Sequence, residues 1–412
     1  SIRRQRQMCI RDRFEKENGF RLAKEQRDAV EKSMKAGIMV ITGGPGTGKT
    51  TLIRAIITAA EQNGLEPALM APTGRAAKRL AISSGRDADT IHKALEASVR
   101  ETGRTYFERN EANPLEEDLI IVDEASMLDI SLFYHLLCAL KDGARLILVG
   151  DIDQLPPVGA GEPLKDLMSW GYVPIVRLKR IFRQEEGSGI VENAALIRKG
   201  EMCVPDEAGE FRIVYAADDE DAYRIVMDLC RELNYGNEEN KMLLQVLSPM
   251  YRGVCGVDHL NESLQEMIHG EKVPDGMKFF PGDKVMQTRN DYEKGIYNGD
   301  VGTVWTATPQ KVFVRYFDKE VVYEGEERFD LRLAYAVTVH KSQGSEYETV
   351  IFILRPSQHN MLQRNLLYTG VTRARKNTIL VTAPDALRRA LAIQHTGNRY
   401  SLFLPFLNHE AL

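Results

Sequence analysis

The sequence predicts an α/β protein with two tandem units, each built on a parallel sheet. Short aliphatic and β-branched runs recur between helical stretches, a glycine-rich loop follows the first run, and a second series of runs begins near residue 242. Strands buried in a parallel sheet form such continuous apolar runs, and the segments between them fit crossover helices. The expected strands are 38–41, 67–71, 119–122 and 145–150 in the first unit, and 242–248, 349–354 and 378–383 in the second.

Two regions interrupt the α/β pattern. Turn residues surround a short aromatic run at about 96–114, which predicts an inserted β-hairpin. Alternating short strands with Asn-Gly and Gly-Asp turns predict a small β-barrel at 279–332. The expected organisation is a first unit at 21–180, a second at 181–278 and 333–412, and a charged tail at 1–20 that we interpret as the end of an upstream region.

Composition limits the class of protein. A chain of 412 residues has room for two or three domains, and its 43% hydrophobic content is ordinary for a globular protein. The net charge of −5 disfavours a small basic DNA-binding module but leaves room for a local basic groove. Five scattered cysteines without CxxC spacing indicate neither a disulfide framework nor a zinc site, which favours a cytoplasmic location. No run is long and apolar enough for a membrane helix, so no membrane partner is expected.

The stretch "GGPGTGKT" at 43–50 fits the phosphate-binding pattern G-x-x-x-x-G-K-[ST] between a predicted strand and a predicted helix. Its glycines let backbone N–H groups converge on phosphate oxygens, and the helix N-terminus adds partial positive charge. Lys49 is expected to neutralise the β- and γ-phosphates of ATP, and Thr50 to ligate Mg²⁺. The residues expected to bind nucleotide here are Gly44, Pro45, Gly46, Thr47, Gly48, Lys49, Thr50 and Thr51.

Polar side chains follow two further strands. In "LIIVDEASM", Asp123 is placed to hold Mg²⁺, and Glu124 to act as general base toward the attacking water. A bare Asp-Glu pair is usually a solvated loop start, but with the preceding glycine-rich loop it indicates hydrolysis. In "LVGDIDQLPPVGAG", Gln154 is placed to contact both the γ-phosphate and the water. Transfer of a phosphoryl group also needs positive charge, for which "LKRIFRQ" and "TRARK" offer Arg180, Arg183, Arg373 and Arg375.

Taken in order, the motifs resemble those of superfamily 1 DNA helicases, and most closely the RecD-like, 5′-to-3′ branch, the exodeoxyribonuclease V alpha-subunit family. The resemblance covers about 20–407 and includes "APTGRAA", "TIHKAL", "VDEASM", "GDIDQLPPVG", "TVHKSQGSE" and "YTGVTRAR". It implies two RecA-like domains, with the hairpin as a strand-separating pin and the β insert as an SH3-like subdomain.

The resemblance also implies roles for individual residues. Gln26 resembles the adenine-reading glutamine, and Arg183 and Arg373 resemble the γ-phosphate arginines that act from the second unit. Gly344 and Glu346 resemble the segment that couples nucleotide to the DNA strand. Thr73, His92 and His340 lie where such helicases touch single-stranded DNA, although Thr73 is equally well placed as a helix N-cap and a lone histidine is often structural.

The function expected from these features is an ATP- and Mg²⁺-dependent DNA helicase that moves 5′ to 3′ along single-stranded DNA and acts at single-strand/duplex junctions in repair or recombination. The main alternative is a nucleotide-dependent DNA-binding subunit of a larger nuclease or recombination complex, with other subunits as partners. A P-loop kinase would leave "HKSQG" and Arg373 unexplained, and "DEASM" with "QLPPVG" favours DNA over RNA as the substrate.

Overall fold

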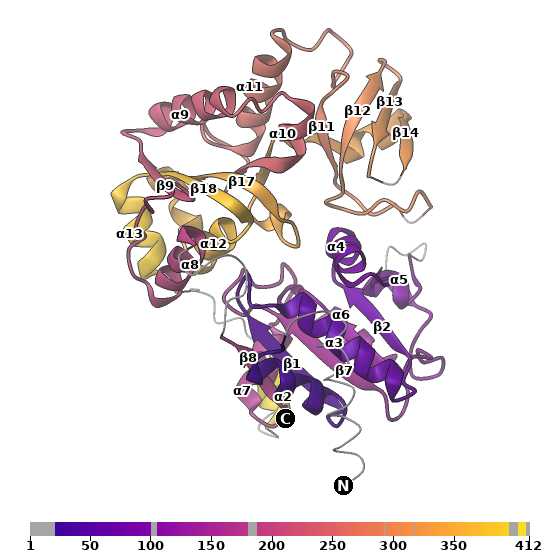
Figure 1. The fold of residues 1–412 in the computed structure, drawn as a ribbon. Coiled ribbons are helices and arrows are strands. Elements are labelled where there is room, and N and C mark those ends of the chain that lie inside the picture. Colours follow the sequence, from indigo (N-terminus) through magenta and orange to yellow (C-terminus); the bar gives the residue numbers. More distant parts are fainter. Residues whose placement is uncertain are drawn as a thin grey trace. The chain divides into compact units, whose positions relative to one another are not determined.

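The computed structural model describes residues 21–99, 105–179, 188–291, 293–317, 319–394 and 403–408. The chain divides into two compact units, Ser1–Glu185 with Gly397–Leu412, and Glu186–Thr396. Each unit has a central parallel sheet flanked by helices (Figure 1). The predicted fold class of two tandem α/β units is therefore confirmed.

The sheet of the first unit has six parallel strands in the order β3-β2-β6-β7-β1-β8. The strands are β1 (Ile38–Gly43), β2 (Pro67–Ala71), β3 (Asp89–Thr90), β6 (Leu119–Val122), β7 (Arg145–Gly150) and β8 (Ile175–Leu178). All four strands expected from the apolar runs are present, and every residue of β6 is fully buried. Because the strands run parallel, the loops that follow β1, β6 and β7 leave the sheet at one edge.

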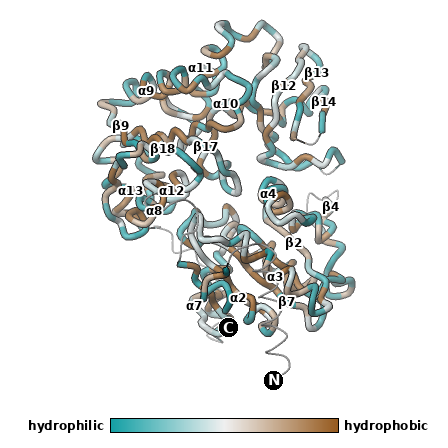
Figure 2. The backbone as a smooth tube through the Cα atoms, in the orientation of Figure 1, coloured by the Kyte–Doolittle hydropathy of each residue, from teal (hydrophilic) through white to brown (hydrophobic). Residues whose placement is uncertain are grey.

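Helices cover this sheet with apolar residues. The larger ones are α2 (Lys24–Ser33), α3 (Lys49–Gln62), α4 (Gly74–Ser84), α6 (Ile130–Cys138) and α7 (Pro163–Trp170), with short α5 (Ile91–Ala94) and η1 (Ala125–Met127). The helix expected after the glycine-rich loop is α3, which buries Leu52, Ile53, Ile56 and Ile57. Hydrophobic segments lie in the interior of each unit and hydrophilic ones on its surface (Figure 2).

The end of the chain differs from the expected organisation. We expected residues 333–412 to lie in the second unit, but Gly397–Leu412 belongs to the first. The physical reason is the short helix α14 (Phe403–Leu407), whose Phe403 and Leu407 pack against the core of the first unit. The Phe403 ring lies 5.8 Å from the ring of Phe133 in a T-shaped arrangement.

The sheet of the second unit has five parallel strands in the order β16-β10-β17-β18-β9. The strands are β9 (Phe211–Tyr215), β10 (Leu244–Ser248), β16 (Ala336–Thr338), β17 (Tyr347–Leu354) and β18 (Ala374–Thr382). The helices are α8 (Gly189–Lys199), α9 (Asp219–Glu232), α10 (Glu238–Leu243), α11 (Val257–His269), α12 (Arg364–Val371) and α13 (Pro384–Ala392), with η3 (His340–Ser342) and η4 (Pro356–Met361). The strand expected at 242–248 begins two residues later, because Met242 and Leu243 end α10.

The insert in the second unit is a five-stranded antiparallel sheet in the order β14-β13-β12-β11-β15. It comprises β11 (Lys284–Gln287), β12 (Val301–Ala307), β13 (Lys311–Arg315), β14 (Glu320–Glu324) and β15 (Leu331–Leu333), with η2 (Gly325–Asp330). A buried polar network joins it to the parallel sheet. The ammonium of Lys284, which is fully buried, donates hydrogen bonds to the Leu244 carbonyl, to Oε1 of Gln245, each at 3.0 Å, and to the Tyr235 hydroxyl at 3.3 Å.

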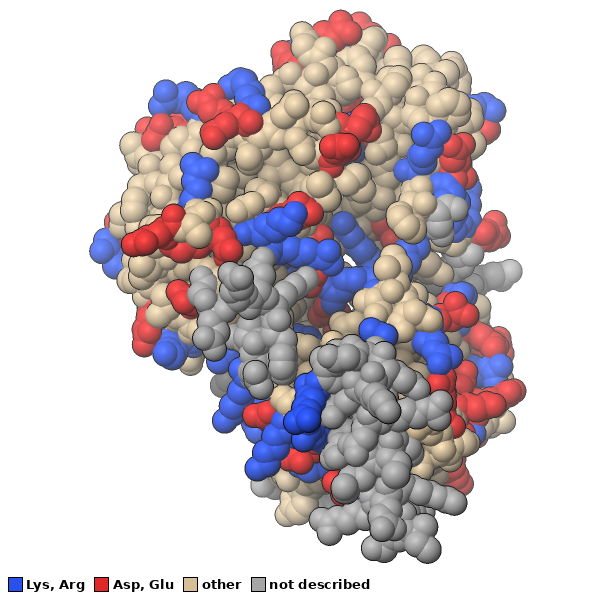
Figure 3. Space-filling model, viewed as in Figure 1, with Lys and Arg blue, Asp and Glu red and all other residues tan. Residues whose placement is uncertain are grey.

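The expected hairpin in the first unit is formed by β4 (Ala97–Val99) and β5 (Thr105–Phe107), which pair antiparallel. Over the described ranges, no helix has the length and hydropathy needed to cross a bilayer. Lysine and arginine are interspersed with aspartate and glutamate on the face drawn in Figure 3, in keeping with the small net charge of −5.

Candidate nucleotide and DNA sites

The glycine-rich loop connects β1 to α3 in the geometry that the motif predicts. Gly46 and Gly48 have φ values of 72° and 77°, in the left-handed region that favours glycine. A Cβ on Gly43 would lie 2.6 Å from Oγ1 of Thr47, so this position also has no room for a side chain. Nζ of Lys49 donates hydrogen bonds to the carbonyls of Gly43 at 2.6 Å and Gly44 at 3.0 Å. The lysine therefore lies over its own loop, where phosphate oxygens can replace these carbonyls as acceptors.

Gln26 lies beside this loop at the start of α2 and is 3% exposed. Its Oε1 accepts a hydrogen bond from the Ala23 N–H at 3.0 Å, and its Nε2 donates to the Gly48 carbonyl at 3.4 Å. The side chain thus joins α2 to the phosphate-binding loop. Its expected role in reading adenine stays a prediction.

The two carboxylates follow β6 directly, and each is 5% exposed. Glu124 has a φ of 53°, so the backbone turns sharply between Asp123 and the 3-10 helix η1. Burial raises the pKa of the Asp123 carboxyl above its ordinary value, and the neighbouring charge of Glu124 raises it further; the charges of Arg79 and Lys49 oppose this. Oδ1 of Asp123 is buried and has no hydrogen-bond partner among the described residues.

This unpartnered oxygen fits the expected magnesium site. Mg²⁺ prefers oxygen ligands and is usually held by one or two carboxylates together with substrate phosphates, rather than by a cage of protein ligands. In the described residues, no group of three His, Cys, Asp or Glu side chains could hold a metal by itself. The donor set of Asp123 and the Thr50 hydroxyl therefore suits a metal that is completed by a nucleotide.

Gln154 lies just beyond β7 and is 7% exposed, and its Oε1 is buried without a hydrogen-bond partner in the described part of the chain. Oγ of Ser126, which follows β6, is also buried without a hydrogen-bond partner in the described part of the chain. Because β1, β6 and β7 are adjacent and parallel, Lys49, Asp123 and Gln154 project from one edge of the sheet. Buried oxygens without a partner also occur on Asp206, Gln287 and Asn365 of the second unit, but those of Asp123, Ser126 and Gln154 all follow the adjacent strands β6 and β7.

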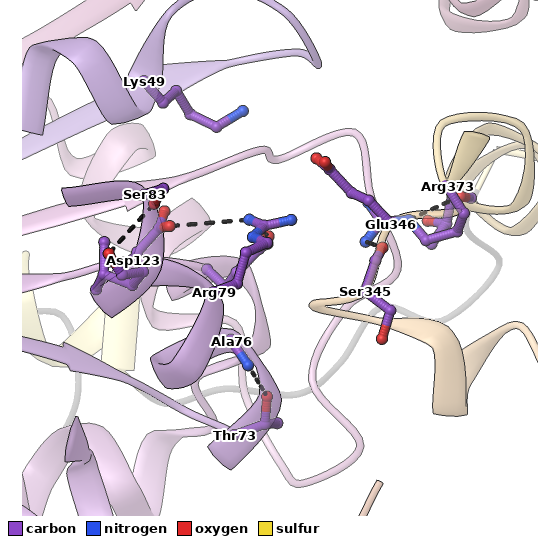
Figure 4. A network of polar contacts seen from close by, with 12 residues as sticks. Lys49, Thr73, Ala76, Arg79, Ser83, Asp123, Ser345, Glu346 and Arg373 are labelled. Atoms are coloured by element: carbon purple, nitrogen blue, oxygen red, sulfur yellow. Dashed lines mark hydrogen bonds and ion pairs between the residues drawn. The ribbon is translucent and has the colours of Figure 1, made fainter. Parts of the chain in front are cut away.

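Sequence reasoning missed Arg79, which lies on α4. Its Nη2 is 2.7 Å from Oε1 of Glu124 and 3.9 Å from Oδ2 of Asp123. Figure 4 shows the Arg79 side chain next to Asp123, and a dashed line marks the hydrogen bond that Nη2 of Arg79 donates to Oε1 of Glu124. No local signal marks this arginine, because a lysine- and arginine-rich helix face usually faces solvent.

In the second unit, the structure brings Arg373 together with the "QGSE" segment. Arg373 is 3% exposed; its Nε donates to the Thr369 carbonyl at 3.2 Å and its Nη1 to the Ser345 carbonyl at 3.1 Å (Figure 4). Gly344 has a φ of 74°, and Glu346 forms an ion pair with Arg375 at 2.8 Å. The guanidinium of Arg373 therefore fixes the segment from Gly344 to Glu346. Arg183 and Arg180 lie outside the described residues.

The three expected DNA contacts occupy different local settings. Thr73 is the N-cap of α4, and its Oγ1 accepts from the Ala76 N–H at 3.3 Å, which confirms the capping interpretation without testing the DNA contact. His92 is half-buried with its ring 5.9 Å from that of Phe107, and burial lowers its pKa while the charge of Asp129 opposes this. His340 begins η3 directly after β16.

A hollow of about 760 Å³ lies in the second unit beside β16. Lys278, Arg332 and Lys341 line it, together with Tyr251, which is 42% exposed. Burial lowers the pKa of Lys278 and Lys341, and the positive charge of Arg332 lowers both further. Asp258 and Glu262 also line the hollow, and Nη1 of Arg332 lies 3.9 Å from Oδ1 of Asp258, so the cations are partly balanced by acidic side chains.

Comparison with known proteins supports this assignment of elements. A family model for an AAA domain matches residues 26–160, one for the SH3 domain of ATP-dependent RecD-like DNA helicases matches 260–316, and one for the UvrD-like helicase C-terminal domain matches 333–381. The RecBCD enzyme subunit RecD of Mycolicibacterium smegmatis is 34% identical over 92% of this chain and 74% of its own length. The chain belongs to the RecD helicase family. The ATP-dependent RecD2 DNA helicase of Deinococcus radiodurans is 38% identical over 92% of this RecD-family chain, which spans about half (52%) of that relative.

Solved structures of Pif1 helicases share the fold of this RecD-family chain. Pif1 from Bacteroides in complex with ADP-AlF3 and single-stranded DNA gives a TM-score of 0.55 at 21% identity, covering 94% of this chain and 96% of that one. Pif1 from Candida albicans gives 0.54 at 20% identity, covering 91% and 97%. The likeness extends over both α/β units.

Proposed function

We propose that this chain is the motor core of an ATP-dependent DNA helicase, which hydrolyses ATP to move 5′ to 3′ along single-stranded DNA and separate duplex. The observation that carries the proposal is the edge of the first sheet, where Lys49, Asp123 and Gln154 project together and two of them carry buried oxygens without partners. Family membership supports DNA as the substrate and the 5′-to-3′ direction.

In the proposed reaction, the N–H groups of the glycine-rich loop and the Lys49 ammonium hold the β- and γ-phosphates of ATP. Asp123 and Thr50 would hold Mg²⁺, which supplies positive charge to the phosphate oxygens. Glu124 accepts a proton from the attacking water, and Gln154 orients that water. Arg183 and Arg373 are proposed to stabilise the charge on the transferring phosphoryl group.

The DNA track is proposed to include the N-terminal end of α4 at Thr73 in the first unit. In the second unit, it would include His340 and the cations Lys278, Arg332 and Lys341 around the hollow. Contacts to phosphates would dominate affinity, so binding should weaken steeply as salt is added. The change in nucleotide contacts between ATP and ADP states would alter the grip on DNA and advance the strand.

Two substitutions test the active-site part of the proposal. Lys49→Ala and Glu124→Gln should each lower the rate of ATP turnover by about 10²-fold or more. For Glu124→Gln, this is the contribution expected from general-base catalysis alone. Lys35→Ala is the matched control, because Lys35 is an exposed lysine of the same unit that pairs with Glu31 on α2. Full turnover in either active-site variant would overturn the assignment.

A second candidate function is supported by the relatives named as RecBCD subunits. In that case, the chain would bind nucleotide and DNA as one subunit of a larger recombination complex and would not unwind DNA independently. Unwinding of a forked duplex by the isolated chain would exclude this alternative, and ATP turnover without unwinding would favour it.

A further inference from the structure

Arg79 on α4 forms a close ion pair with one of the two carboxylates, Glu124. Nη2 of Arg79 lies 2.7 Å from Oε1 of Glu124, whose side chain is 6% exposed, while the Arg79 side chain is 27% exposed. A charge-assisted hydrogen bond of this length is among the stronger ones in proteins. Partial burial also limits the screening that weakens surface ion pairs.

This contact acts against the proposed role of Glu124. The Arg79 guanidinium occupies Oε1 of Glu124, the oxygen that would face the attacking water. The same contact holds Oε1 toward α4, so this oxygen must exchange Arg79 for water before it can accept a proton. Glu124 in the observed state is therefore restrained in position by a residue of α4.

The helix α4 links this restraint to the expected DNA contact. Thr73 caps its first turn, and Arg79 follows six residues later on the same helix. The residues that α4 buries are Gly74, Ala76, Ala77 and Leu80, so only Leu80 is large. Because an alanine methyl buries little apolar area, a small shift of this helix over the sheet has a low energetic cost. A ligand bound at Thr73 would act on the same helix that carries Arg79.

We propose that Arg79 is the positioning residue that withholds Glu124, and that single-stranded DNA bound at the N-terminal end of α4 draws Arg79 away and frees the base. In the step that is released, the water oxygen forms a bond to the γ-phosphorus of ATP. The water gives one proton to Glu124, and the bond from that phosphorus to the bridging oxygen breaks, so that its electron pair leaves with ADP. This inference rests on the proposed function and explains how DNA would stimulate hydrolysis.

The test measures ATP turnover of Arg79→Ala and wild type with and without oligo-dT. Coupling between sites typically amounts to a 5–150-fold effect, so DNA-free turnover of Arg79→Ala should rise by at least about fivefold, and the stimulation by DNA should shrink by the same factor. Arg79→Lys keeps the charge without the planar fork and should show a smaller change in the same direction. A purely structural role for Arg79 would lower both rates without changing their ratio.

Controls separate this inference from the proposed function. Arg86→Ala removes an exposed arginine that pairs with Glu61 at 2.8 Å in the same unit, and should leave both rates unchanged. If the wild type is stimulated by DNA and Glu124→Gln is inactive, but neither Arg79 variant changes the stimulation ratio, only the inference fails. If Glu124→Gln retains full turnover, the proposed function itself fails. Should Arg79→Ala not fold, an unchanged ratio in Arg79→Lys is sufficient to overturn the inference.

Discussion

Replacing Asp123 by asparagine should stabilise the nucleotide-free protein while removing its activity. Asp123 is 5% exposed, and its Oδ1 has no hydrogen-bond partner among the described residues. The adjacent Glu124 adds like-charge repulsion, and burial raises the Asp123 pKa. Asparagine keeps the shape and removes the charge, so the substitution relieves a penalty that native proteins usually avoid.

The magnitude follows from the buried charge. Asparagine still places a polar atom here, so the gain comes from removing the buried charge, whose desolvation exceeds that of a neutral polar group by about 1 kcal/mol or more. In a domain of the size of the first unit, each kcal/mol shifts the melting temperature by roughly 2–4 °C. The melting temperature of Asp123→Asn should therefore exceed that of wild type by at least about 2 °C, measured by differential scanning fluorimetry without nucleotide. Addition of ATP and Mg²⁺ should reverse the order, because only wild type then gains a carboxylate ligand.

The pH dependence has a definite sign. Because the folded-state pKa of Asp123 is raised, the native state binds more protons than the unfolded state between the ordinary carboxyl value of 3.8 and the raised value. The free energy of unfolding of wild type therefore falls as pH rises through this window, and the advantage of Asp123→Asn should grow. Asp118→Asn is the control, since the Lys141 hydrogen bond lowers the pKa of Asp118 and its removal should bring no gain. A lower melting temperature for Asp123→Asn would refute the reasoning.

Two further predictions concern the second unit. Lys284→Met should lower the free energy of unfolding, measured with urea, by about 1–3 kcal/mol, because the buried Leu244 carbonyl and Gln245 Oε1 lose their donor. Lys311→Met, at an exposed lysine of β13 that pairs with Glu324, should change it little, and similar losses in the two variants would contradict the role of the network. Lys341→Ala should weaken binding of single-stranded DNA in a filter-binding titration. The slope of log affinity against log salt concentration should fall by about one, the value for one lost phosphate contact. An unchanged slope would show that Lys341 is not part of the DNA track.

Much of the first unit could be predicted because its signals are local. The apolar runs of β1, β2, β6 and β7 and the glycines of the phosphate-binding loop each specify a conformation within a few residues. The adjacency of Asp123 and Gln154 then follows from the parallel sheet. Arg79 could not be predicted, because its partner is 45 residues away and an arginine on a helix usually faces solvent.

The second unit was less predictable for related reasons. Strand β9 (FRIVY) contains an arginine and is only partly buried, and β16 has three residues, so neither forms the continuous apolar run by which the other strands were predicted. The burial of Arg373 depends on carbonyls of Thr369 and Ser345, which no motif reports. Helix α14 belongs to the first unit because Phe403 and Leu407 pack against its core. These contacts join residues far apart in the sequence, which no local pattern reports.

The central claim is that this chain uses ATP to move along DNA in the 5′-to-3′ direction. Partial duplexes with a single-stranded tail at only the 5′ end or only the 3′ end test it most directly, with strand separation followed by fluorescence and Glu124→Gln as the inactive control. We expect ATP-dependent separation of the substrate with the 5′ tail and little separation of the substrate with the 3′ tail. Preferential separation from the 3′ tail would contradict it.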